Sequence, residues 1–145
     1  MKDPSGHKPF GKILIGYDGG PDAERALRMA RELALASKAK LYLIGVECLP
    51  ESASAEAFQA AVASALKNYE EVFYRTRLGG MNEGLHVETF IALGQPALWL
   101  IRKAQQLRAR LIVIGPGRNG LGSVCKRVLI EAPCAVLVSR GAECA

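Results

Sequence analysis

A glycine-dense segment lies where an α/β protein would hold an anion. Between Ile114 and Val124 the chain reads Gly-Pro-Gly-Arg-Asn-Gly-Leu-Gly-Ser, after an apolar run at 111–114 and before a helical pattern. Glycines let backbone N–H groups converge on one point, and the N-terminus of the following helix attracts negative charge. This segment is therefore the first candidate for a phosphate-binding site. The residues singled out in it are Gly115, Gly117, Gly120, Gly122, Ser123 and Val124.

Basic residues gather in the same part of the chain. Residues 102–145 hold eight Lys or Arg against two acids, although the whole chain carries a net charge of only +5. Arg118, Lys126 and Arg127 flank the glycine segment and would concentrate a positive field on an anionic ligand. The alternative is that they are scattered surface charges that serve solubility. The sequence has no basic stripe interleaved with aromatic residues, so extended nucleic-acid binding is not expected.

Apolar strands and amphipathic helices alternate along the chain. Strands apolar on both faces predict a parallel sheet covered by helices on two sides, and right-handed crossovers leave a small set of doubly wound topologies. The predicted strands span 13–17, 41–46, 86–91, 111–114 and 134–138. Four helices are predicted. The first begins at Pro21, and the second runs through Phe58, Val62, Leu66, Tyr69 and Phe73 to a stop near Gly79-Gly80. The third spans Pro96 to Leu107, and the fourth carries Val124, Val128 and Leu129 ahead of Pro133.

Three loops can reach the edge of such a sheet where ligands bind, which is beyond the carboxyl ends of the strands at the point where strand order reverses. They are Asp18-Gly19-Gly20, the segment that follows Val46, and the glycine segment. Together they suit a nucleotide, with its ribose near Asp18 and its phosphates near Ser123. For both residues an alternative stays open: Asp18 as a turn or helix-capping carboxylate, and Ser123 as the N-cap of the last helix.

From Phe10 to Gly141 the chain resembles the universal stress protein family. The resemblance implies an open five-stranded parallel α/β sheet in the order 3-2-1-4-5, with helices on both faces, of the adenine nucleotide alpha hydrolase-like, Rossmann-like kind. The likeness is carried by the opening Ile13 to Gly19, by Gly94-Gln-Pro-Ala97, by Leu111 to Gly115, by Gly122-Ser-Val124 and by Ala132 to Val138.

The resemblance also implies roles for the residues at the edge of the sheet. In nucleotide-binding members the residue matching Asp18 contacts the ribose, and the residue matching Val46 offers its backbone to adenine. The glycine segment, with Gly122 and Ser123, would hold the phosphates. Tyr17 and Gly19 flank Asp18 and are counted with the site. The expected cofactor is therefore ATP or another adenine nucleotide.

The glycine segment departs from the family pattern in its length. ATP-binding members resemble G-x-x-G, then nine residues, then G-S or G-T, whereas here Gly117-Arg-Asn-Gly120 is separated from Gly122-Ser123 by Leu121 alone. If Gly115 is the first glycine, Arg118 stands where the second should be. Loss of two N–H contacts to phosphate, at about 1.5–3 kcal/mol each, would lower affinity about a hundredfold or more. Direct phosphate contacts from the flanking basic residues would offset part of this loss.

Other functions are disfavoured by pattern. The stretch 115–120 fits G-x-G-x-x-G, but a dinucleotide-binding fold needs that motif after its first strand, with an acid about twenty residues later. A receiver domain would need an acidic pair where Asp18 stands alone, and the chain has no P-loop motif. The four cysteines lack metal-ligand spacing, and we expect them to be reduced and mostly buried. Because His7 and His86 lie away from the predicted site, catalysis is not expected.

The predicted organisation is a tail at 1–9, one universal stress protein-like domain at 10–141 and a short tail at 142–145. Because no segment reads as a signal peptide or a membrane span, a cytoplasmic protein without membrane contact is expected. The apolar run Ala135–Val138 would form a sheet edge, and such edges usually pair, so a homodimer is expected. We predict a stress-response protein that binds an adenine nucleotide and is not an enzyme, with slow ATP hydrolysis as the most that its residues would support. The alternative is a dimeric interaction module whose site is vestigial.

Overall fold

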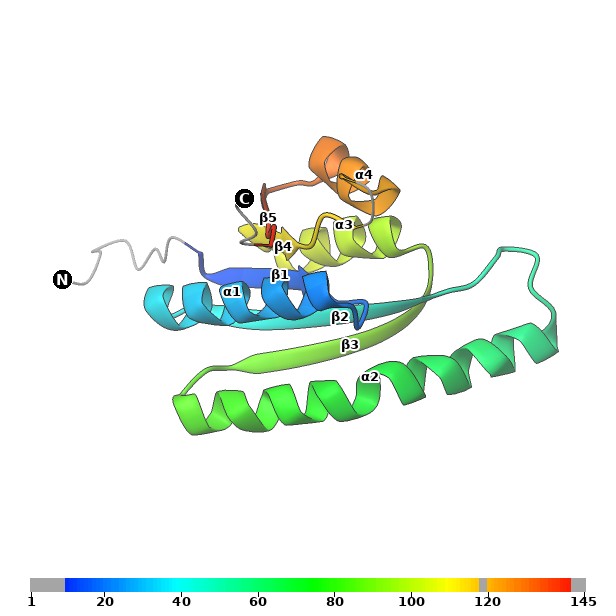
Figure 1. The fold of residues 1–145 in the computed structure, drawn as a ribbon, viewed down its shortest axis with the longest axis horizontal. Helices are drawn as coiled ribbons and strands as arrows, with labels where there is room; N and C mark the ends of the chain where they lie inside the picture. The colour runs from blue at the N-terminus through cyan, green and yellow to red at the C-terminus, as the bar shows by residue number, and fades with distance from the viewer. Residues whose placement is uncertain (1–9, 118–119, 142–145) are drawn as a thin grey trace.

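The computed structural model describes residues 10–117 and 120–141, so the predicted tails at 1–9 and 142–145 lie outside the described residues. The described chain forms a five-stranded parallel sheet in the order β3-β2-β1-β4-β5, which confirms the predicted topology (Figure 1). The strands are β1 Lys12–Gly16, β2 Lys40–Cys48, β3 Val87–Gly94, β4 Leu111–Ile114 and β5 Ala135–Val138. The helices are α1 Pro21–Ser37, α2 Ala55–Glu83, α3 Pro96–Leu107 and α4 Ser123–Glu131.

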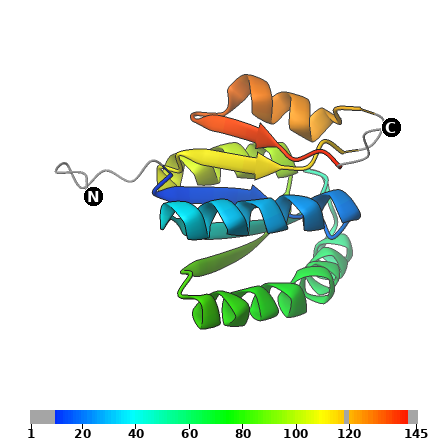
Figure 2. The ribbon, with the colours of Figure 1, turned by 60° about the vertical axis from the view of Figure 1, so that its left-hand side comes forward.

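Each face of the sheet is covered by its own pair of helices. Ile13 and Ile15 of β1 pack with residues of α1 and α2, whereas Leu14 packs with residues of α3 and α4. This division follows from the period of two along a strand, which sends successive side chains to opposite faces. Figure 2 shows β5 at one edge of the sheet with α4 beside it. The central strands are buried on both faces, as the uninterrupted apolar runs predicted.

The second helix is longer than the sequence predicted. It continues through Gly79 and Gly80 to Glu83 and ends at Gly84, whose φ of 73° is left-handed. The stop predicted near Gly79-Gly80 was wrong because Gly80 serves a packing contact: a Cβ atom there would lie 2.6 Å from Val87 Cγ2. Glycine in this helix therefore allows the chain that enters β3 to approach closely, and the helix ends one turn later.

The first turns of α2 extend beyond the ends of the strands (Figure 1). Asn68 donates a hydrogen bond to Glu47 near the end of β2, which places this part of α2 beside the end of the strand. Phe58 and Leu66, two of the apolar residues that marked this helix in the sequence, are 50% and 46% exposed. The buried stripe of α2 instead includes Ala65, Tyr69 and Phe73. The apolar pattern thus located the helix, although part of it faces solvent.

The cysteines and two helical side chains differ in exposure. Leu129 of α4 is 42% exposed. Cys125 is buried and Cys134 is half-buried, but Cys48, at the last position of β2, is exposed. Cys144 lies outside the described residues. Trp99 of α3 is half-buried, and its Nε1–H donates to the Leu93 carbonyl at 2.8 Å.

In the described part of the chain, the helices are all too short or too polar to cross a membrane.

Candidate functional site

The candidate site begins with a difference in strand length. β1 pairs with β2 only as far as Gly16 opposite Ile44, whereas β2 and β3 continue to Cys48 opposite Gly94. The Tyr17 N–H donates to the Ile44 carbonyl at 2.9 Å, so the backbone of Ile44 points toward β1. The direction in which backbone N–H and C=O groups point repeats every second residue along a strand. The N–H and C=O groups of Val46 therefore face the space beyond the end of β1.

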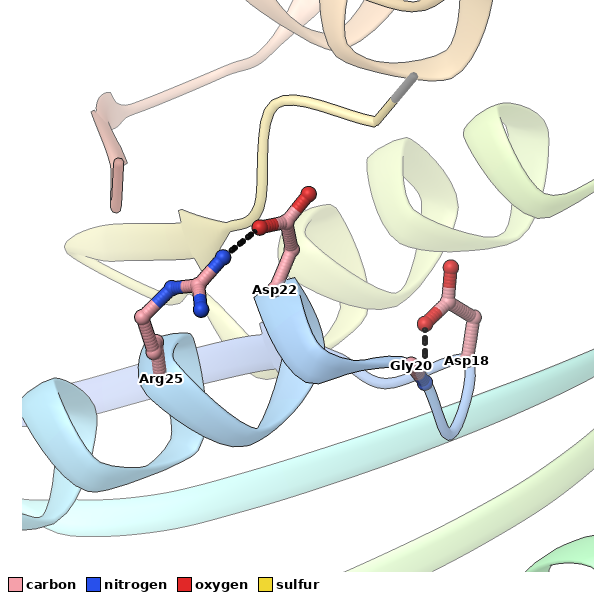
Figure 3. Close-up of polar contacts among 4 residues, drawn as sticks. All are labelled: Asp18, Gly20, Asp22 and Arg25. Carbon is pink, nitrogen blue, oxygen red and sulfur yellow. Dashed lines mark hydrogen bonds and ion pairs between the residues drawn. The ribbon is translucent and has the colours of Figure 1, made fainter. Parts of the chain in front are cut away.

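Asp18 lies beside this space, on the turn that joins β1 to α1. Its Oδ1 accepts the Gly20 N–H at 2.9 Å, and Gly19 takes a left-handed φ of 87° (Figure 3). The predicted turn role of Asp18 is therefore present, while Gly20 itself is the N-cap of α1. Figure 3 shows the second oxygen of Asp18 directed away from the turn. This exposed oxygen is available to a hydroxyl donor such as a ribose.

Tyr17 contributes its backbone to this edge, whereas its side chain lies in the core. The ring is 4% exposed and packs edge-on against Tyr69 and Phe73, and the hydroxyl donates to Glu24. Burial, and then the Glu24 carboxylate, raise the pKa of Tyr17 well above its usual value. Because Tyr17 continues the face occupied by Ile15, its side chain turns toward α1 and α2. Tyr17 was assigned to the site from the sequence without considering that side chains alternate between the two faces of the sheet along β1.

Tyr69 of α2 is a residue at this edge that sequence reasoning missed. Its hydroxyl donates to the Val46 carbonyl at 3.4 Å, and a Cβ atom at Gly45 would lie 2.6 Å from its ring. Burial raises its pKa to about 12, and the carboxylates of Glu47 and Asp18 act in the same direction. Tyr69 thus lies beneath the space between Asp18 and Val46. The available signal was Gly45, because a glycine inside a strand often marks a close approach.

The segment between β4 and α4 closes on itself. The Gly122 N–H donates to the Pro116 carbonyl at 2.6 Å, and a Cβ atom at Gly117 would lie 3.3 Å from Gly122 Cα. Gly117 and Gly120 both have a left-handed φ of 84°. Gly122 is the N-cap of α4 and Ser123 is its first residue, so Ser123 is not the N-cap that the sequence offered as an alternative. The short segment has thus used one of its N–H groups internally.

Gly115 brings this segment against the start of α1. A Cβ atom at Gly115 would lie 2.8 Å from Asp22 Cβ, so a larger residue would not fit without movement. Asp22 forms an ion pair with Arg25, and both side chains remain partly exposed (Figure 3). The sequence assigned Asp22 only to the start of the helix. The structure places this carboxylate beside the segment expected to hold phosphate.

The basic residues predicted to flank the glycine segment differ in their surroundings. Arg127 Nε contacts Glu131 Oε2 at 2.7 Å, and its Nη1 donates to Gln95 Oε1 at 3.3 Å. Its guanidinium is therefore held by α4 itself and by the residue that precedes α3. Lys126 is exposed in the first turns of α4, and Arg118 lies outside the described residues. Of the basic residues that the structure describes there, Lys126 is the one not directed to a carboxylate.

His86 and Glu47 lie at opposite ends of the sheet. His86 precedes β3, at the opposite end of the sheet from Asp18, and pairs with Glu88 at 3.2 Å. Glu47 lies at the site edge and accepts from Asn68 at 3.2 Å. Among residues 10–117 and 120–141, no group of His, Cys, Asp or Glu side chains could hold a metal ion.

These features define a doubly wound α/β protein whose candidate ligand-binding edge lies at the carboxyl ends of β1, β2 and β4. The chain belongs to the universal stress protein family, whose model matches residues 9–140. It is 31% identical over 138 residues to a universal stress protein of Thermus aquaticus, an alignment that covers 90% of this chain and 99% of that protein.

Solved structures of universal stress proteins share this fold. The UspA protein of Lactobacillus plantarum superposes with a TM-score of 0.77 at 22% identity, covering 90% of this chain and 98% of that one. An Arabidopsis thaliana family member with AMP bound gives a TM-score of 0.63 at 19% identity, covering 91% and 92% of the two chains. At these identities the structural likeness establishes the fold.

Proposed function

We propose that this protein binds an adenine nucleotide at the carboxyl edge of its sheet. The observation that carries the proposal is the position of Val46, whose backbone N–H and C=O face the space beyond β1 beside the exposed Asp18. Such a pair of groups can hydrogen-bond the edge of an adenine ring. Support also comes from universal stress proteins crystallised with cAMP, with dAMP and with AMP.

Each part of the nucleotide has a proposed partner. The base contacts Val46 and the ribose contacts Asp18, next to Gly19 and the backbone of Tyr17. The phosphate contacts the first turn of α4, whose N-cap carries no side-chain cap and whose N–H groups need partners. The residues assigned to that contact are Gly115, Gly117, Gly120, Gly122, Ser123 and Val124.

The test is isothermal titration calorimetry with AMP, cAMP, ADP and ATP on the wild type and on Asp18→Ala. Loss of hydrogen bonds to a charged oxygen, at about 1.5–3 kcal/mol, predicts at least about tenfold weaker binding by Asp18→Ala. Glu70→Ala, which removes an exposed carboxylate from α2, is the control and should bind normally. Absence of binding by the wild type would reject the proposal, and unchanged affinity in Asp18→Ala would reject the role of that residue.

We also propose that the protein acts by binding rather than catalysis. Near the site, the described carboxylates are already engaged: Asp18 with Gly20, Glu47 with Asn68, and Asp22 with Arg25. None of these pairs holds a histidine, which is the commonest general base. Cys48, Cys125 and Cys134 are free thiols, which supports a reducing, cytoplasmic location. ATP turnover above a no-enzyme blank, retained in purified protein, would contradict this assignment.

A homodimer through β5 completes the proposal. Ser139 N–H donates to the Ile114 carbonyl, so the alternation along β5 turns the N–H of Val136 toward the open edge of the sheet. Val136→Pro removes that outward donor while it leaves the bonds to β4, and Val136→Thr keeps the donor as a control. Light scattering at micromolar concentration should find a dimer for the wild type and the Thr variant and a monomer for the Pro variant. A monomeric wild type would contradict the dimer.

The vestigial interaction module is the second candidate function. The bond from Gly122 N–H to the Pro116 carbonyl favours it, because a donor used inside the segment is not offered to a ligand. A wild-type dimer that binds none of the four nucleotides would select it.

A further inference from the structure

A groove lies along the last turns of α2, at the end of the sheet opposite to the proposed nucleotide site. The end of α2 and the start of β3 lie side by side there (Figure 1). The groove has a volume of about 500 Å³, which is within the range of small-molecule sites. Its lining includes Tyr74, Arg77, Leu78 and Met81 of α2, and Leu85 and Val87 at the entry to β3.

The wall that α2 contributes is mainly apolar and exposed. Tyr74, Leu78 and Met81 follow one another at steps of four and three residues, so they form one stripe on the helix. They are 54%, 43% and 74% exposed, whereas the neighbouring Phe73 is buried in the core. Leu85 is also buried and forms part of the floor. Exposed apolar side chains gathered in this way mark a surface that binds something.

Arg77 adds a positive charge to this apolar groove. Its Nη1 donates to Thr89 Oγ1, and its guanidinium lies 5.9 Å from the centre of the Tyr74 ring. Among the residues that the structure describes, no carboxylate pairs with it. An arginine has five N–H donors, so donors remain after the bond to Thr89. Arginine binds a carboxylate with two parallel hydrogen bonds, which makes a carboxylate the matching group.

The carboxylates nearest in the chain do not neutralise this charge. Glu83, the last residue of α2, pairs with Arg31 of α1. Glu88 alternates to the other face of the sheet, where burial and then its carboxylate raise the pKa of Tyr42. Glu70 is exposed and lies about 10 Å back along the helix from the guanidinium-bearing residue. A ligand that fills the groove therefore meets one unpaired cation beside apolar side chains.

We propose that this groove binds a free amphipathic anion, a monocarboxylate with an unbranched alkyl chain. The carboxylate pairs with Arg77 beside Thr89, and the chain covers Leu78, Met81 and Leu85. Six residues of helix, about 9 Å, separate Arg77 from the end of α2, which gives room for a chain of medium length. An apolar face alone would suit a protein partner equally well, but the unpaired guanidinium calls for a single anionic group.

The test is isothermal titration calorimetry of the wild type with octanoate, decanoate, acetate, 1-octanol and octylammonium, each below its micelle concentration. Octanoate should bind, and decanoate should bind about fourfold or more tightly than octanoate because two more methylenes leave water. Acetate should show no binding. The alcohol and the ammonium ion should bind at least about tenfold more weakly than octanoate, since neither makes a charge-assisted bond to the guanidinium.

Variants separate the contribution of the charge from that of the apolar wall. Arg77→Gln should weaken octanoate binding about tenfold and change 1-octanol binding less than about twofold, and Arg77→Lys should lose less because it keeps the charge. Leu78→Ala should weaken both ligands. Arg75→Gln is the matched control, because Arg75 pairs with Glu71 and lies about 200° around the helix from Arg77. It should leave octanoate binding unchanged, and thermal unfolding should show that all variants are folded.

Several results would overturn this proposal. They are no binding of octanoate to the wild type, equal binding of 1-octanol and octanoate, an unchanged octanoate affinity in Arg77→Gln, or the same loss in Arg75→Gln. A lower oligomeric state of Leu78→Ala in light scattering would assign the groove to a second copy of the chain instead. Arg77→Gln should bind AMP as the wild type does, because Asp18 lies at the opposite end of the sheet, so failure here leaves the proposed function standing.

Discussion

The two adjacent glycines of α2 predict opposite responses to the same substitution. An alanine within a helix is favoured over glycine by about 0.5–1 kcal/mol, and this term is common to both positions. At Gly79 the nearest atom to an added Cβ is Arg31 Nη2 at 3.7 Å, which is an ordinary contact with a flexible side chain. Gly79→Ala should therefore stabilise the protein by about 0.5–1 kcal/mol.

At Gly80 the added Cβ would lie 2.6 Å from Val87 Cγ2 and 2.9 Å from the Leu85 carbonyl oxygen. The carbonyl cannot move freely, because the Leu85 N–H is bonded to the Gly80 carbonyl at 2.7 Å. Overpacking of this kind costs about 1–3 kcal/mol. Since the helix term cancels between the two variants, Gly80→Ala should be less stable than Gly79→Ala by about 1–3 kcal/mol.

Urea unfolding followed by circular dichroism measures this difference directly, and thermal unfolding should separate the variants by about 3–9 °C. The slope of the urea transition should be the same in both variants, which would show that the change is in stability alone. Equal stability of the two variants within about 0.5 kcal/mol would refute the argument that Gly80 exists for the close approach of β3.

Two further predictions concern aromatic side chains near the carboxyl ends of the strands. An unfolded tyrosine ionises near pH 10, whereas burial raises the pKa of Tyr69 to about 12. The contribution of the protonated Tyr69 to folding stability is therefore complete below pH 10 and is lost as the pH rises from 10 to 12. Between pH 10 and 12 the free energy of unfolding, measured with urea, should fall by about 1–2 kcal/mol less in Tyr69→Phe than in the wild type. Equal falls in the two proteins would contradict the assigned burial of Tyr69. Trp99→Phe removes the 2.8 Å bond to the Leu93 carbonyl and should lower stability by about 1 kcal/mol in the same assay at neutral pH; an unchanged midpoint would show that water replaces the indole.

The sheet could be predicted because its signals are local and periodic. The apolar runs that became β1 and β4 are buried on both faces, and Pro21 and Pro96 each stand at the first position of a helix. Asp18 and Val46 could then be assigned to one edge by topology alone, because parallel strands end together. The order of the strands needed the family resemblance, since right-handed crossovers leave more than one order open.

The details of the site could not be predicted, because they depend on contacts between elements. Whether Gly80 ends a helix or permits a contact depends on where Val87 lies, and the local pattern is the same in both cases. The position of Tyr69 beneath Val46 depends on how far α2 slides along the sheet. The approach of Asp22 to Gly115 likewise requires the folded positions of two distant segments.

The candidate site owes its existence to unequal strand lengths more than to any motif. β2 has nine residues and β1 has five, and their pairing begins together at Lys12 and Lys40, so β2 continues past the end of β1 with only β3 as its neighbour. One edge of the β2 backbone is thereby left facing an open space, and there Val46 can offer both a donor and an acceptor to a planar base. A glycine segment of any length would bind phosphate weakly without that neighbouring contact, because a helix N-terminus alone supplies about 1 kcal/mol.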